Sequence, residues 1–235
     1  MMPLRRIKLR SVINVACDTD GKYNQKENKE DMTLKELEAK IQQLEDIEAI
    51  RKLQYAYGYY LAHWQEEEIV DLFSDDAVLD LPRGIRRGKE AIRKYYDYAD
   101  HYATGKPKPP GFLHQLMPLC GIIDIETDGK TAKGRWYGFG LYGLPIEDRI
   151  QALIGTGIWE NEFVKEDGIW KFKTLLYRGA FNSRYEKGWV EEPRWAEAPR
   201  RKVKPPEAGA ADSTGYAYPS GNVFPYHFKN PVTGK

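Results

Sequence analysis

Hydrophobic side chains recur every three or four positions over residues 33–64, which is the spacing of one face of a helix. The stripe consists of Leu34, Leu37, Ile41, Leu44, Ile47, Ile50, Leu53, Tyr57 and Tyr60. Thr33 and Glu36 have the spacing of a capping box, in which each side chain accepts a hydrogen bond from the backbone N–H of the other residue. The pattern predicts one long amphipathic helix that ends near Trp64.

After this helix, short helical and extended patterns give way to long extended ones. We expect a helix over residues 65–73, a strand over 77–81, a return strand over 85–87 and a helix over 89–102. Proline and glycine over residues 104–111 then break the pattern. Four strands follow, over residues 113–126, 131–141, 150–165 and 169–181, with Asp-Gly turn signals at 128–129 and 167–168.

Helices that precede a run of antiparallel strands are typical of the α+β class, with the sheet curled around the long helix. We assign this domain to residues 32–185. Residues 1–31 have no periodic apolar face, and we expect a disordered extension or a misassigned start rather than a targeting signal. Residues 186–235 are predicted to form a linker rich in proline and glycine and then an aromatic arm, which packs on the domain or on a neighbouring subunit.

Composition narrows the classes of function. The chain has 36 lysines and arginines against 35 aspartates and glutamates, so no basic field would attract nucleic acid. Its two cysteines cannot form a disulfide framework, and it has no phosphate-binding loop and no metal-ligand motif. The apolar run at residues 11–17 is too short to span a membrane. We therefore predict a cytoplasmic protein with no cofactor, no metal and no membrane partner.

Three polar residues fall on predicted apolar faces. Arg178 is an even number of positions from Trp170 and Phe172, which places it on the same apolar face of the predicted strand. An uncompensated cation there is costly, so Arg178 should meet an anionic group of a ligand. The alternatives are that its side chain snorkels to solvent or pairs with a structural carboxylate. His114 shares parity with apolar neighbours and is either a satisfied core group or an acid–base catalyst. Tyr57 lies on the inner stripe of the long helix, as a catalytic or a core tyrosine.

Several segments resemble SnoaL-like (nuclear transport factor 2-like) proteins. They are residues 46–57, residues 72–78, residues 134–137, residues 167–170 and Tyr177 with Arg178. The resemblance covers about residues 33–185 and implies a cone-shaped, curved antiparallel sheet wrapped around the long N-terminal helix. Within the family, the chain is most similar in functional residues to bile-acid 7α-dehydratases and more distantly to scytalone dehydratases.

The resemblance implies catalytic roles for Tyr57, His114 and Arg178. An aspartate that the dehydratases carry five residues after the tyrosine is replaced by Ala62. The resemblance also implies a homotrimer. Apolar residues on both faces of the strand over residues 150–165 predict independently that both faces are covered.

We therefore predict a cofactor-independent lyase, a dehydratase, acting on a hydroxylated aromatic or polycyclic molecule in an apolar pocket. His114 would be the acid or base, Tyr57 a proton donor, and Arg178 the group that stabilises enolate charge. The predicted pocket walls are Tyr60, His63, Trp64, Leu116, Trp136 and Leu176. Open alternatives are an isomerase or cyclase, a carbon–carbon lyase of diaryl compounds, and a non-catalytic binding protein, which Ala62 favours.

Overall fold

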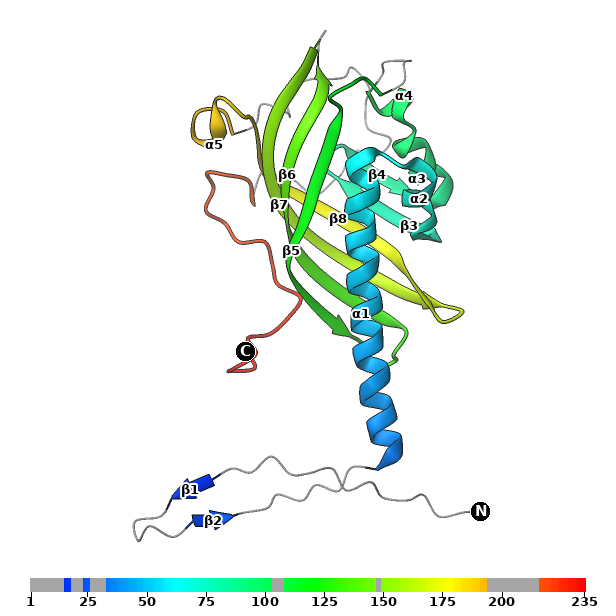
Figure 1. Cartoon of the computed structure of the whole chain (residues 1–235), viewed down its shortest axis with the longest axis vertical. Helices are drawn as coiled ribbons and strands as arrows, with labels where there is room; N and C mark the ends of the chain where they lie inside the picture. Colours follow the sequence, from blue (N-terminus) through cyan, green and yellow to red (C-terminus); the bar gives the residue numbers. More distant parts are fainter. Residues whose placement is uncertain (1–14, 18–22, 26–32, 103–107, 147–148, 194–215) are drawn as a thin grey trace. The chain divides into compact units, whose positions relative to one another are not determined.

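The computed structural model describes residues 15–17, 23–25, 33–102, 108–146, 149–193 and 216–235. It divides into two compact units, Met1–Asp46 and Ile47–Lys235. In the first unit, strands β1 (Val15–Cys17) and β2 (Tyr23–Gln25) pair antiparallel, which the sequence pattern did not predict. Helix α1 (Leu34–His63) begins in the first unit and ends in the second (Figure 1).

Helix α1 begins and ends as predicted. The Thr33 backbone N–H donates to the Glu36 carboxylate at 2.7 Å, and the Glu36 N–H donates to the Thr33 hydroxyl at 3.2 Å, so the capping box is confirmed. At the other end Trp64 has a φ of +52°, a left-handed conformation that stops the helix. Among the described residues, no helix has the length and apolar composition needed to cross a bilayer.

Within the described part of the second unit, one curved, unclosed sheet contains six strands in the order β4-β3-β8-β7-β6-β5 (Figure 1). Its strands are β3 (Phe73–Leu81), β4 (Gly84–Arg87), β5 (Leu113–Ile125), β6 (Thr131–Ile146), β7 (Arg149–Glu166) and β8 (Ile169–Arg184). The helices of this unit besides α1 are α2 (Glu66–Asp71), α3 (Lys89–Tyr96), α4 (Tyr98–Tyr102) and α5 (Gly188–Glu191). The predicted α+β class is confirmed.

Two local details differ from the sequence prediction. Strand β3 pairs parallel with β8, whereas all the other pairs in this sheet are antiparallel. The predicted helix over residues 89–102 is two helices, because Asp97 leaves the helical conformation and its carboxylate accepts the backbone N–H of Asp100 at 2.8 Å. An aspartate in this position caps a new helix start.

The core lies between α1 and one face of the sheet, which we call the inner face. Tyr57 of α1 packs edge-on against Phe172 and Trp159, with ring centres 5.7 and 6.3 Å apart. Glycines on this face leave room for tyrosine rings to lie close to the backbone. A Cβ at Gly140 would collide with the Tyr142 ring, and one at Gly157 would collide with the Tyr177 ring.

The C-terminal arm, residues 216–235, contacts the opposite, outer face of its own sheet. The Arg135 guanidinium of β6 donates to the carbonyl oxygens of Pro225 and Phe224 at 2.7 and 3.1 Å. His227 of the arm pairs with Glu160 of β7. These contacts fix the arm on the back of the sheet, and an additional contact with a second subunit stays a prediction.

Candidate functional site

His114 lies on the inner face near the start of β5. It pairs across the sheet with Tyr142, whose ring centre is 5.0 Å from the imidazole centre. The Tyr102 hydroxyl lies 2.9 Å from Nδ1 of His114, and the Trp64 ring centre is 5.2 Å from the imidazole. His114 is therefore half-buried among aromatic rings, with one nitrogen hydrogen-bonded to a phenol.

The surroundings of His114 favour its neutral form. Burial, and secondly the positive charge of Arg83, lower the pKa of His114 to about 3. At neutral pH the imidazole is uncharged, so one ring nitrogen can accept a proton, while the N–H on the other is too weakly acidic to serve as a general acid. The site thus holds a base, and any acid must come from another group.

Tyr57 is buried on the other side of the same interior. Its hydroxyl lies 2.9 Å from the Tyr96 hydroxyl, and burial raises the pKa of the Tyr57 phenol. Tyr142 and Tyr177 form a second hydrogen-bonded phenol pair, and burial raises the pKa of both. All four phenols keep their protons at neutral pH and are available as hydrogen-bond or proton donors.

Trp64 connects His114 with the Tyr57 pair. Its ring lies beside His114, and 5.7 Å from the ring of Tyr96, while its indole N–H donates to the Tyr96 carbonyl oxygen at 2.6 Å. We call the resulting group the inner cluster. It comprises Tyr57, Trp64, Tyr96, Tyr102, His114, Tyr142 and Tyr177.

Sequence reasoning placed Tyr57, Trp64 and His114 in the site but missed the other four tyrosines. Tyr142 is an even number of positions from Trp136, so both side chains lie on the same face of β6. This alternation is the signal from which Tyr142 could have been predicted to face inward. Tyr96 and Tyr102 stand on short helices whose facing direction the sequence does not fix.

Arg178 does not join the inner cluster, and the predicted orientation is wrong. Between the pairs Phe163–Phe172 and Glu162–Thr174 the register of β8 shifts at a β-bulge. The extra residue reverses the alternation, so Arg178 turns to the outer face. There its guanidinium binds both carboxylate oxygens of Asp80, at 3.0 and 2.8 Å.

The predicted wall residues divide between interior and exterior. Tyr60 packs against the buried core, and Leu116 and Trp136 are buried on the inner face. Trp136 lies far along β6 from Tyr142 and packs on Phe163, 6.0 Å between ring centres. His63 is exposed at the end of α1, and Leu176 follows the bulge to the outer face, so neither side chain lies on the inner face with the inner cluster.

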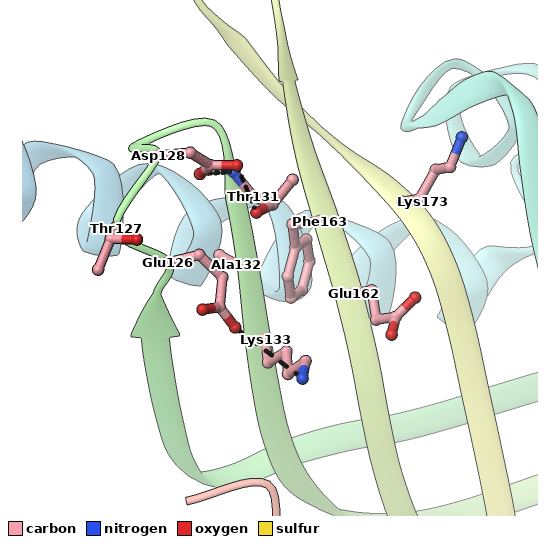
Figure 2. Close-up of a pocket in the computed structure, with 9 residues that line it drawn as sticks. All are labelled: Glu126, Thr127, Asp128, Thr131, Ala132, Lys133, Glu162, Phe163 and Lys173. Atoms are coloured by element: carbon pink, nitrogen blue, oxygen red, sulfur yellow. Dashed lines mark hydrogen bonds and ion pairs between the residues drawn. The ribbon is translucent and has the colours of Figure 1, made fainter.

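A cavity of about 470 Å³ opens at the other end of the sheet, around the β5–β6 turn (Figure 2). Its lining residues are Glu126, Thr127, Asp128, Thr131, Ala132, Lys133, Glu162, Phe163 and Lys173. None of the predicted site residues lines it, and several of its polar groups already have hydrogen-bond partners. Asp128 accepts the backbone N–H of Thr131, for example, and Glu162 accepts the Thr174 hydroxyl. This charged cavity differs from the apolar pocket that the sequence predicted.

Lowering the pH should destabilise the protein through His114. The folded-state pKa lies below the usual value of about 6.5, so the unfolded chain binds more protons between these two values. The contribution of His114 to the free energy of unfolding is complete above pH 6.5 and is lost as the pH falls toward 3. Between pH 7.5 and 5.0, we expect wild type to lose about 2 kcal/mol more unfolding free energy than His114→Gln in urea titrations. Equal losses would contradict the prediction.

Comparison with known proteins agrees with this architecture. The family model described as a SnoaL-like domain matches residues 42–175. A candidate scytalone dehydratase from Novosphingobium aromaticivorans is 22% identical, covering 62% of this chain and 91% of its own, with a TM-score of 0.52. The hexachlorocyclohexane dehydrochlorinase LinA-type3 from Novosphingobium barchaimii is 18% identical, covering 62% and 93%, with a TM-score of 0.52. At these identities the likeness concerns the fold alone.

Proposed function

Since the chain belongs to the SnoaL-like domain family, we propose that it is a cofactor-independent lyase, a dehydratase, of hydroxylated aromatic or polycyclic molecules. The observation that carries the proposal is a neutral imidazole, His114, facing an interior of protonated phenols. A base and separate acids on one apolar surface are what removal of water from a carbon skeleton requires.

In the proposed reaction, His114 takes a proton from the carbon next to the one that bears the hydroxyl group. The carbon–oxygen bond breaks, and the hydroxyl leaves as water with a proton from a phenol of the inner cluster. Return of the proton from His114 to the phenolate restores both groups, so the net change is loss of one water. Tyr57 is our first candidate for the donor, with Tyr96 supporting it by the 2.9 Å hydrogen bond.

The named activities of the similar structures support this class of reaction. Dehydratases and dehydrochlorinases both remove a small leaving group together with a proton, and neither name specifies a substrate for this chain. The described residues include no group of three or more histidine, cysteine, aspartate or glutamate side chains that could hold a metal ion.

A non-catalytic binding protein is the second candidate. Ala62 is buried at the position where the resemblance to bile-acid 7α-dehydratases implies an aspartate, and the Tyr57 hydroxyl already has a partner within the protein. The test is to incubate the purified full chain with a panel of hydroxylated aromatic and polycyclic compounds and to follow loss of water by mass spectrometry. Turnover abolished in His114→Gln would support the lyase. A compound that binds tightly and is recovered unchanged would support the binding protein.

We also propose a cytoplasmic homotrimer. Ile150, Ile154 and Ile158 lie on the outer face of β7 and stay only half-buried in one chain, which leaves apolar surface for a second subunit to cover. Light scattering at micromolar concentration should give three times the chain mass of 27.2 kDa. A mass of one chain would contradict the trimer, and recovery in a membrane fraction would contradict the location.

A further inference from the structure

Arg86 brings a positive charge to the inner face at the edge strand β4. The register of β4 against β3 places Arg86 opposite Leu79, which is fully buried. The next residue, Arg87, lies opposite Val78 and belongs to the outer face. Arg86 is only half-buried, so its guanidinium can reach both the interior and solvent.

The Arg86 guanidinium is held in a fixed position. The guanidinium carbon, Cζ, lies 4.4 Å from the centre of the Tyr95 ring. Its Nη1 donates to the carbonyl oxygens of Arg83 and Gly84 at 3.0 and 2.7 Å. Stacking on an aromatic ring while donating to the backbone leaves the remaining N–H groups of the planar fork directed away from these contacts.

Arg83 lies beside it in the turn between β3 and β4 and connects to the inner cluster. Its Nη1 donates to Nε2 of His101 at 2.9 Å, which leaves the ring proton on Nδ1, 3.1 Å from the Tyr95 carbonyl oxygen. The His101 ring is 4.7 Å from that of Tyr102, whose hydroxyl bonds His114. Arg83 is itself exposed, so an ion can reach it from solvent.

Neither guanidinium has a carboxylate partner among the residues that the structure describes. Arg135, Arg178 and Arg184, by contrast, each bind a carboxylate at 2.7–2.8 Å. Burial, and also the positive charge of Arg83, lower the pKa of Arg86. Two repelling cations at the edge of an apolar interior are costly unless an anion joins them.

We propose that Arg83 and Arg86 form an anion subsite that binds the carboxylate of an aromatic acid, with the ring of the ligand directed toward His114. The guanidinium fork matches the two oxygens of a carboxylate, and the tyrosine and tryptophan rings of the inner cluster match an aromatic body. Because Arg83 already uses one N–H group to donate to His101, the N–H groups that remain on Arg83 and Arg86 suit a ligand with a single negative charge. This inference rests on the proposed function, since it names the substrate class of the same site.

The test compares naphthalene-2-carboxylate with the neutral naphthalene-2-carboxamide, by calorimetry on the full chain at pH 7.5. We expect wild type to bind the carboxylate about 10- to 100-fold more tightly than the amide. Arg83→Gln and Arg86→Gln should each remove most of this preference, and Arg86→Lys should keep part of it, because it retains the charge without the fork. The matched control is Arg87→Gln, which removes the same charge from the outer face and should keep the preference.

The outcomes separate the subsite from the proposed function. Equal binding of the two probes by wild type would overturn the subsite and leave the lyase proposal standing. The subsite would also be overturned if the preference for the carboxylate survived in the Arg83→Gln/Arg86→Gln double variant, or if Arg87→Gln lost it to the same extent. If neither probe binds, the subsite and the interior ligand site fail together. Thermal melts of each variant establish folding, and the exposed Arg83 supplies a test that does not disturb the packing of Arg86.

Discussion

Replacing His114 with alanine is expected to lower turnover of a dehydrated substrate by about 10²–10⁴-fold, the usual contribution of a positioned general base. The structure places this imidazole against the phenols of the inner cluster, and burial keeps it uncharged at neutral pH. Because the side chain is half-buried and a single phenol is its hydrogen-bond partner among the described residues, the variant should fold. Circular dichroism and a thermal melt check this before the rate is measured.

The pH profile distinguishes a catalytic histidine from a structural one. A base with a pKa of about 3 in the free enzyme stays active as the pH falls, so the acid limb of kcat/KM should lie well below pH 6.5. The exposed His63 is a matched control, and His63→Ala should change neither rate nor profile. Full activity in His114→Ala, or an acid limb near 6.5, would show that another group is the base.

The sequence was a good guide wherever a local interaction decides the conformation. The capping box at Thr33 and Glu36 uses atoms three residues apart, and the turn at Asp128 is set by hydrogen bonds to Lys130 and Thr131. His114 and Tyr57 also faced inward as expected, since both lie where the apolar period runs without interruption. Whether they act in catalysis stays a prediction.

The sequence failed where one long-range detail changes a whole pattern. A strand pattern assumes strict alternation, and the bulge in β8 adds one residue that no composition signal marks. The bulge therefore reversed the facing direction of both Arg178 and Leu176 relative to the prediction. Arg86 was missed for a similar reason, because the facing direction of a four-residue strand depends on its register with β3.

The position of Arg178 leads to the second large expected effect, which concerns stability. Arg178→Ala should lower the free energy of unfolding by about 3 kcal/mol, because it leaves the mostly buried carboxylate of Asp80 without its cation. This is opposite to what an uncompensated inward cation would give, since removing that charge would raise stability. Urea unfolding at pH 7.5 measures the difference.

Two control variants show whether the pair or the charge alone matters. Lys173→Ala, on the same strand, removes a cation whose partner Asp76 is exposed, so its cost should stay below about 1 kcal/mol. The double variant Arg178→Leu/Asp80→Leu removes both buried charges and should recover most of the loss, since an apolar pair can replace a buried ion pair. If Arg178→Ala were as stable as wild type, the bidentate pair would not stabilise the fold. If the double variant were no more stable than Arg178→Ala, the loss would come from packing and not from an unpaired carboxylate.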